Sequence, residues 1–524
     1  MKLTYGRYAI IALAALAIML PNLLWGPGDT DDIHYSLIWT EQFGRAMAAG
    51  NLYPRWLPDS FQGLGSPAFY FYPPAPYWLA GGIRATGLPT PFAVTATAAI
   101  LLALSGMAMH AWLTERHTKP LLGALIYMAA PYHLMDIYVR GAMAESATFV
   151  FLPLMALSIA RLPQRNGTLL LCLSFAGLLI THLPMAMLTA LFLIAPLLID
   201  RLRTDRNVLL PATLAGVLAI GLAAFYLLPA LTLQHLISTQ WLWSSWHRPT
   251  SWSLLAPQPL ILLNLGFPAV AVAAMLVALR APPIWRIIIL ITGLSSVGLI
   301  PLMWDMPLLS QVQFPWRLLA IVEFAAITAL LTSRPSILTT GLSAGLILFA
   351  YGHWTQMTVR RFSRPIDLVM LSRDLPDAPE YLPAGFDGRP TEKAGRIMDL
   401  RQWQHLPRGD IITVDRAGPV MVGRAAFPIW QVEHDGAVIP SAGPIIHFDA
   451  PRPGTYRLVR VTLWQESVGR IISLIAALLL AGLYLRFQAI SLLSKFPAYS
   501  PLSPIDDRTL PGWRGRSRQS GGEA

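Results

Sequence analysis

The chain has little charge and almost no cysteine. Asp, Glu, Lys and Arg make up 13% of its 524 residues, about half the share of a typical soluble globular domain. The single cysteine, Cys172, lies in an apolar run, which excludes an intrachain disulfide and a metal site built from cysteines. No GxxxxGKS or GxxxxGKT segment is present, which argues against an ATP-driven pump. Signatures of nucleic-acid and haem binding are also missing.

Hydrophobic residues make up 54% of the chain, and they gather in long runs. A membrane-spanning helix needs roughly 17–25 apolar residues. We predict about twelve spans, at 8–25, 92–113, 120–138, 143–160, 167–183, 185–199, 208–231, 259–279, 287–303, 314–332, 337–352 and 467–487. Leu24, Trp25 and Gly26 form a poor cleavage site for a signal peptide, so we expect the first span to be an uncleaved anchor. The stretch 69–88 is rich in Pro and Gly, which favours a re-entrant or juxtamembrane segment.

The net charge of +11 is distributed in a pattern that predicts orientation. Basic residues fall in alternate short loops, and the positive-inside rule places those loops in the cytoplasm. They are Lys2, Arg7, Arg116, Lys119, Arg161, Arg165, Arg201, Arg203, Arg206, Arg280, Arg286, Arg334 and Arg486. Both termini are then cytoplasmic, and a long first loop, 26–91, lies outside.

The predicted fold is a polytopic α-helical membrane protein with a small β-rich extracytoplasmic domain. Residues 1–352 form the transmembrane module, 353–466 the outer domain, 467–487 the last span and 488–524 a disordered cytoplasmic tail. Within the outer domain, Phe427 to Gly436 and Gly454 to Trp464 alternate apolar and polar residues, which is typical of strands.

An acidic cluster opens the first outer loop: Asp29, Asp31 and Asp32, followed by His34. Carboxylates cost free energy near lipid, so such a cluster often has a function. The alternative is a helix cap, supplied by Asp31 or Asp32 to a helix through Tyr35 to Met47. Zinc binding is only weakly indicated, because Asp32 and His34 do not share a helix face.

Aromatic residues crowd the next part of this loop, in NLYPRW (Asn51 to Trp56) and SPAFYFYPPAPYW (Ser66 to Trp78). Such rings suit the membrane–water interface. They could also form a platform for a lipid-linked sugar, with Tyr72 among them. Arg55 could bind a phosphate there through two hydrogen bonds.

Three more candidates lie in predicted outer turns. In YVRGAMAES, Arg140 and Glu145 could bind substrate or simply pair with each other, with Asp136 nearby. In QVQFPWRLL, Gln313 and Arg317 open a span, and Arg317 could receive a lipid phosphate or extend its charged end towards water. His182, at the outer end of the fifth span, is more simply explained as a structural residue.

The ordered set GDTDDIH, YPRW, GSPAFYFYPP, YVRGAMAE and QFPWR, with EYLPAG and FPIWQVEHDG in the outer domain, resembles a bacterial family. That family is called 6-pyruvoyl-tetrahydropterin synthase-related membrane proteins, and its architecture resembles the GT-C glycosyltransferases. Nothing in the chain supports pterin chemistry. The resemblance covers most of residues 1–490.

The resemblance implies transfer of a sugar from a polyprenyl-phosphate-linked donor to a cell-envelope polysaccharide, lipid or protein, outside the bacterial cytoplasmic (inner) membrane. It implies that Asp31 or Asp32 acts as base or binds a metal, and that Glu145 or Asp136 is a second acidic position. Arg317 or Arg140 would hold the donor phosphate. No cofactor is certain, and a divalent metal ion stays open. The configuration at the anomeric carbon of the sugar is expected to invert.

Two other classes of protein fit the same spans. A transporter or flippase of a lipid-linked precursor would line its path with Arg317 and Glu323. A non-catalytic scaffold would bind envelope polymer through its outer domain. Transporters tend to have repeated halves and central charged sites. Here no repeat is evident and the polar candidates gather on the outer side, which favours the enzyme.

Overall fold

The computed structural model describes residues 2–333, 336–364, 366, 377–386 and 405–493. The chain divides into two compact units, 1–477 and 478–524, with the boundary inside the last helix. The helices are α1 (Lys2–Ile18), α2 (Leu20–Trp25), α3 (Ile33–Ala48), α4 (Ala68–Phe71), α5 (Ala75–Ala85), α6 (Thr90–Thr114), α7 (Pro120–Met128), α8 (Pro131–Met135), α9 (Met143–Ser146), α10 (Phe151–Ala160), α11 (Arg165–Leu179), α12 (Leu183–Thr189), α13 (Ala195–Thr204), α14 (Leu209–Leu222), α15 (Ala224–Thr232), α16 (Gly266–Ala278), α17 (Pro283–Ser296), α18 (Pro301–Trp304), α19 (Leu319–Thr332), α20 (Ile337–Phe362) and α22 (Trp464–Leu493).

Within the described part of the chain, six helical stretches are long and apolar enough to cross a membrane, as expected of a multi-pass membrane protein. They are Thr90–Thr114, Met143–Ala160, Leu183–Thr204, Pro315–Thr332, Ile337–Phe362 and Trp464–Leu485. A seventh span results if α14 and α15, bent by 69° against each other, count as one. Four other predicted spans coincide with helices of 10–17 residues. The predicted number of twelve spans is therefore not confirmed.

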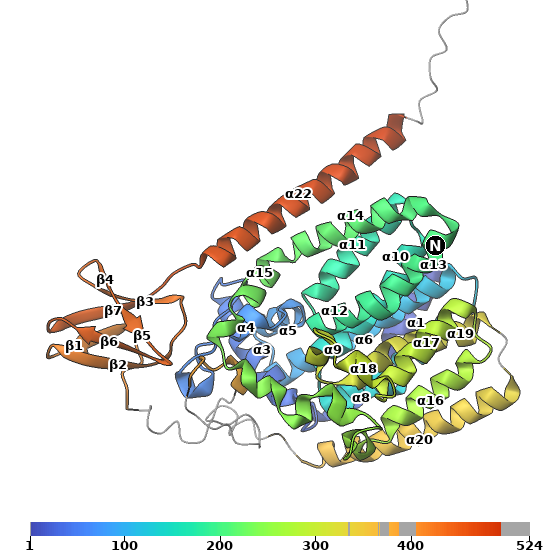
Figure 1. Ribbon diagram of the computed structural model, residues 1–524, viewed down its shortest axis with the longest axis horizontal. Coiled ribbons are helices and arrows are strands. Elements are labelled where there is room, and N and C mark those ends of the chain that lie inside the picture. Colours follow the sequence, from blue (N-terminus) through green and yellow to red (C-terminus); the bar gives the residue numbers. More distant parts are fainter. Residues whose placement is uncertain (1, 334–335, 365, 367–376, 387–404, 494–524) are drawn as a thin grey trace, which may run out of the picture. The chain divides into compact units, whose positions relative to one another are not determined.

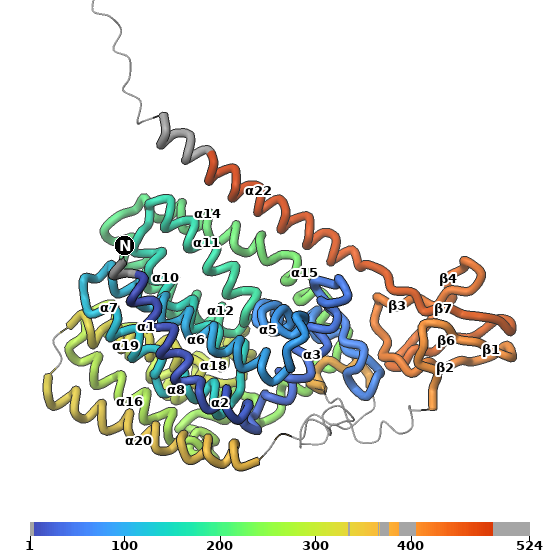
Figure 2. The backbone as a smooth tube through the Cα atoms, turned by 180° about the vertical axis from the view of Figure 1, so that it is seen from behind, coloured from blue at the N-terminus to red at the C-terminus, as the bar shows by residue number. Residues whose placement is uncertain are grey.

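Short helices explain most of the difference in number. The run 120–138 is divided into α7, α8 and a single turn of π-helix, η2 (Asp136–Arg140), with Pro131 beginning α8. The stretch 69–88 contains α4 and α5, which have 4 and 11 residues and are too short to cross a bilayer. Within the first unit, α16 lies along α20 and α10 along α11, from the front and from behind (Figure 1, Figure 2).

Seven strands in the described residues 405–493 form two antiparallel sheets, with orders β1-β7-β3-β4 and β2-β6-β5. They are β1 (Ile411–Val414), β2 (Gly418–Ala425), β3 (Trp430–His434), β4 (Ala437–Ile439), β5 (Ser441–Ala442), β6 (Ile445–Ala450) and β7 (Gly454–Arg460). Side chains from both sheets, among them Val432, Tyr456 and Phe448, enclose a shared apolar core. The predicted strands are confirmed by β3 and β7.

The predicted boundaries around this β-domain need correction. Helix α20 continues to Phe362, ten residues past the expected start of the polar segment, and the ring of Phe362 packs on Tyr138 of η2 with centroids 6.2 Å apart. Helix α22 begins at Trp464 and reaches Leu493. The predicted tail therefore begins later than residue 488, and residues 494–524 lie outside the described part of the chain.

The aromatic run of the first outer loop is a packed core, which corrects its interpretation as an interface belt. Phe69 and Tyr70 are fully buried, and Tyr77 is 2% exposed. They share one apolar cluster with Phe427 and Tyr381, which come from the C-terminal half of the chain. Edge-to-face ring pairs such as Phe69–Tyr77, with centroids 5.0 Å apart, are the favoured geometry. Sequence alone could not show that a distant segment covers these rings.

Candidate functional site

A buried ionic cluster lies where η2 joins α9. The π-helical turn carries Asp136 and Arg140, and α9 carries Glu145. Single turns of π-helix occur often at functional sites. Arg140 Nη1 donates to Asp136 Oδ1 at 2.7 Å and lies 2.7 Å from Glu145 Oε2. The pairing of Arg140 with Glu145 that the sequence left open is therefore present.

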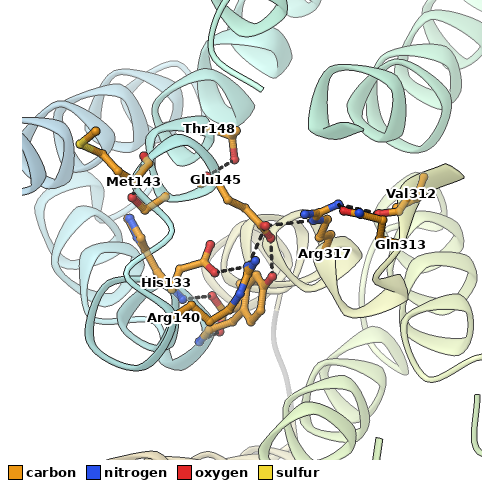
Figure 3. Close-up of polar contacts among 12 residues, drawn as sticks. His133, Arg140, Met143, Glu145, Thr148, Val312, Gln313 and Arg317 are labelled. Carbon is orange, nitrogen blue, oxygen red and sulfur yellow. Dashed lines mark hydrogen bonds and ion pairs between the residues drawn. The ribbon is translucent and has the colours of Figure 1, made fainter. Parts of the chain in front are cut away.

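Arg317 contacts the same carboxylate from the start of the candidate span Pro315–Thr332. It belongs to η12 (Pro315–Leu318), and its Nε donates to Glu145 Oε2 at 3.0 Å. Tyr132 donates its hydroxyl to the other oxygen of Glu145 at 2.6 Å. Figure 3 shows Glu145 between the two guanidinium groups. Glu145 is 1% exposed and has both oxygens engaged, so it is suited to holding two cations in place.

A strained turn directs the second half of the Arg317 guanidinium. Gln313 has φ 69° and ψ −54°, and the N–H of Phe314 donates to the carbonyl of Val312 at 2.9 Å. This is a γ-turn with positive φ, a rare and strained form. It leaves the Val312 carbonyl as an acceptor for Arg317 Nη1 at 2.5 Å (Figure 3). Gln313 Oε1 lies 3.5 Å from the same nitrogen, so the predicted residues Gln313 and Arg317 are brought together.

Asp32 is held beside this cluster by its backbone. Its N–H donates to the carbonyl of Arg140 at 2.7 Å, and that of Asp31 donates to Val139 at 3.3 Å. Gly141 permits the approach: it has φ 65°, and a Cβ there would lie 2.1 Å from Thr30 Oγ1. A backbone conformation of this kind favours glycine.

The side chain of Asp32 has no hydrogen-bond partner among the described residues. Asp32 occupies the N-cap position of α3, as the cap alternative expected, but its side chain makes no cap hydrogen bond. Burial raises the pKa of this half-buried carboxyl, while the charge of Arg140 opposes the shift. A raised pKa makes a carboxylate a stronger base.

Asp31 faces a different partner. Its carboxylate pairs with Arg361 at the end of α20, and half of the side chain is exposed. Asp29 Oδ1 accepts from the ring Nε2–H of His34 at 2.9 Å. These three residues therefore form a separate polar edge, and the structure distinguishes Asp31 from Asp32 where the sequence did not.

His182 presents a hydrogen-bond donor near the cluster. It is the N-cap of α12, and its Nδ1 accepts the N–H of Met185 at 3.1 Å. A neutral ring that accepts at Nδ1 carries its proton at Nε2. The side chain is 8% exposed, and its ring experiences the charges of Arg317, Glu145 and Arg140.

Two carboxyl groups near Asp32 were not predicted. Burial raises the pKa of Glu380 to about 7, with smaller contributions from the charges of Asp377 and Asp32. Asp377 is fully buried and accepts from Trp39 Nε1 at 2.8 Å. EYLPAG was visible as a motif, but its glutamate was not assigned. Asp377 gave no signal at all, because its partner lies 338 residues away.

Aromatic rings lie around Trp39, the hydrogen-bond donor to Asp377. Tyr72 is half-buried, and its ring centroid lies 4.7 Å from that of Trp39. The ring of Trp39 also packs at 6.0 Å from that of Tyr381. Tyr72 lies close enough to Asp32 and Arg317 to experience their charges.

Arg55 lies outside the cluster. It is 3% exposed, its Nε lies 3.5 Å from Glu466 Oε2, and its Nη2 donates to the carbonyl of Phe225 at 2.7 Å. Tyr70 donates to the other oxygen of Glu466 at 2.6 Å. This arrangement ties the first outer loop to the start of α22 and corrects the expectation that Arg55 meets substrate at the site.

Glu323 has a local structural partner. Its two oxygens accept the N–H groups of Tyr132 and His133 at 2.7 and 3.3 Å, which caps the start of α8 from a neighbouring helix. The carboxylate is therefore engaged and does not line an open path through the bundle.

The residues present do not fit a metal centre formed by protein ligands alone. Within the described ranges, no group of three His, Cys, Asp or Glu side chains could hold a metal ion. Asp29 and Asp31 are turned to His34 and Arg361, away from Asp32. The chemistry below is therefore assigned to the side chains of the chain itself.

Comparisons with known proteins give little further information. No family model and no curated protein matches the chain, so the resemblance to the pterin-synthase-related family is not shown. Two solved structures of the arabinofuranosyltransferase AftD from mycobacteria, one of them a mutant, are similar at 15% identity and a TM-score of 0.44. The matches cover 71% and 68% of this chain but 27% and 28% of the AftD chains, so the chain spans about a quarter of their length. A score this low supports no conclusion about activity.

Proposed function

We propose that the chain is a membrane glycosyltransferase that moves a sugar from a polyprenyl-phosphate-linked donor to a cell-envelope acceptor, at the outer face of the bacterial inner membrane. One observation carries the proposal. The unpaired, half-buried carboxylate of Asp32 lies beside the buried guanidinium groups of Arg140 and Arg317. Sugar transfer from a phosphate needs a base on one side and a cation on the other.

Asp32 is the proposed base. Its side chain has no hydrogen bond to any described residue, and burial raises its pKa above the usual range. A carboxylate of raised pKa accepts a proton from a sugar hydroxyl more readily. The paired carboxylates of Asp136 and Glu145 are occupied by arginine, so we assign Glu145 a positioning role in place of the predicted catalytic one.

Arg317 is the proposed phosphate-binding residue. Arg140 is shared by two carboxylates, which leaves little of its charge uncompensated. Arg317 shares one carboxylate with Arg140, and its Nη2 donates to no described residue. Charge-assisted hydrogen bonds from such a nitrogen to a phosphate are about twice as strong as neutral ones. The Nε2–H of His182 supports this as a second donor.

The proposed reaction is a single displacement. Asp32 accepts the proton of the acceptor hydroxyl, the oxygen of that hydroxyl forms a bond to the anomeric carbon, and the bond from that carbon to the phosphate oxygen breaks. The electron pair leaves with the lipid phosphate, whose charge is stabilised by Arg317. The anomeric centre inverts. The half-buried ring of Tyr72 offers an aromatic face for the sugar.

The test uses the purified full chain in nanodiscs with a panel of radiolabelled polyprenyl-phosphate sugars and mixed envelope acceptors. Asp32→Asn is expected to lower turnover by a factor of about 100 or more, in the range for loss of a general base. Asp31→Asn is the matched control, because Asp31 is the adjacent carboxylate and pairs with Arg361. It should retain turnover within a few-fold.

Different outcomes would refute the assigned base, the enzymatic function or the single displacement. Equal loss in both variants would remove the assignment of Asp32 as the base. Transport of the intact donor across the bilayer, unchanged in Asp32→Asn, would favour a flippase. Binding without turnover in every variant would favour a scaffold. A product that retains its anomeric configuration would contradict the single displacement.

A further inference from the structure

A second polar cavity lies at the opposite end of the bundle from Asp32. It has a volume of about 290 Å³, against the 10–15 Å³ needed to hold one water molecule. The ends of α6, α10, α13 and α19 and the start of α17 enclose it. Glu145 and Ala160 are the two ends of one candidate span, so roughly 22 Å separates this cavity from the ionic cluster at 1.5 Å per residue.

Two arginines line the cavity against one carboxylate. Arg116 comes from the loop after α6, and Arg201 and Asp200 come from α13. Desolvation lowers the pKa of Arg116, and the charge of Arg201 lowers it further, since the two guanidinium groups repel each other. Neighbouring Glu115 compensates only in part, because it is also paired with Arg161.

The guanidinium groups keep donors available on the cavity side. Arg201 donates through Nη2 to the carbonyl of Leu162 at 2.8 Å, and its Nε is buried without a partner among the described residues. The guanidinium carbon of Arg116 lies 4.3 Å from the centroid of a Trp112 ring, and no described acceptor receives its N–H groups. A buried donor such as Arg201 Nε is destabilising while it stays unpaired, so an anion that accepts from it would bind favourably.

The start of α17 adds a third anion-binding element. Ile284 and Trp285 line the cavity within the first turn of this 14-residue helix. The first N–H groups of a helix have no partner within the helix, and the helix dipole favours an anion there. Arg286 is turned away, because it donates to carbonyls at the end of α16.

We propose that this cavity binds the phosphate group of an anionic phospholipid in the predicted cytoplasmic leaflet. The apolar ends of the surrounding helices stop at this level, where the buried rings of Trp112 and Trp285 form the apolar wall of the cavity. Basic pockets between spans on the cytoplasmic side suit anionic headgroups. Two cations against one carboxylate favour a lipid with net negative charge over a zwitterionic one.

The test measures lipid binding to the full chain by native mass spectrometry in detergent. Phosphatidylglycerol, phosphatidylcholine with the same acyl chains, and inorganic phosphate are added separately. The wild-type chain is expected to retain phosphatidylglycerol about tenfold more tightly than phosphatidylcholine, and Arg116→Gln/Arg201→Gln should abolish that preference. Arg203→Gln is the matched control: it removes the same charge from the same helix, two residues away on another face.

The binding pattern decides the matter. An unchanged preference in the double variant overturns the proposal, and so does an equal loss in Arg203→Gln. Occupancy and thermal protection by inorganic phosphate alone overturn the lipid source. If the double variant fails to fold, Arg116→Gln replaces it, because Arg116 is exposed and contributes one ring contact. That single variant should weaken phosphatidylglycerol binding several-fold, and no change would refute the site.

Discussion

Gly141→Ala tests whether the backbone at η2 positions Asp32. Gly141 has φ 65°, and a Cβ there would lie 2.1 Å from Thr30 Oγ1 and 3.4 Å from the backbone nitrogen of Ile33. Contacts this short cannot persist, so the segment that carries Thr30 must move. Asp31 and Asp32 follow directly, and their N–H groups bond to the carbonyls of Val139 and Arg140.

The expected cost has two parts. A residue with a Cβ in the left-handed region costs about 1–2 kcal/mol. Displacement of the segment then weakens two backbone hydrogen bonds, each worth about 1 kcal/mol. Gly50→Ala is the matched control, since Gly50 also follows a helix with positive φ and its Cβ would meet nothing within 4 Å. It should incur the first cost alone.

The assay compares apparent melting temperature in detergent with sugar-transfer turnover. Gly141→Ala should lose more of both than Gly50→Ala, and turnover should fall further than stability predicts because Asp32 is displaced from the cluster. Thr30→Ala removes the oxygen of the shortest contact. The double variant Gly141→Ala/Thr30→Ala should therefore recover part of the stability and turnover that Gly141→Ala loses. Equal losses for the two glycine variants, with no coupling to Thr30, would refute the reasoning.

Two further predictions concern the surroundings of the site. Burial raises the pKa of Asp377 to about 6, above an unfolded value of about 3.9, so the folded chain holds a proton that the unfolded chain releases. Stability should therefore fall as pH rises from about 4 through 6, and Asp377→Asn should reduce the difference in unfolding free energy between pH 5 and pH 7.5 by about 1.4 kcal/mol; an unchanged difference would contradict the assignment. Arg55→Met leaves Glu466 without its buried cation and should cost about 3 kcal/mol of stability. Its KM for the sugar donor should stay that of the wild type, and a large rise in KM would return Arg55 to the substrate site.

The polar residues at the predicted outer ends of the helices could be found from sequence, but their partners could not. YVRGAMAE and QFPWR contain Arg140, Glu145 and Arg317, and all three meet in one cluster. The pattern could not show that Glu145 binds both arginines, because Arg317 is 172 residues away. For the same reason, it could not exclude Arg55, whose partner Glu466 is in α22.

Composition and apolar run length determined that this chain is helical and rich in segments able to cross a membrane, because lipid admits only backbones that satisfy their own hydrogen bonds. Alternation of apolar and polar residues determined the strands of the small β-domain. The tertiary structure alone decided which aspartate of GDTDDIH has a side chain without a hydrogen bond to any described residue. Asp31 turns to Arg361 while Asp32 lies beside Arg140, and this choice depends on the close approach that Gly141 allows between two segments about 110 residues apart.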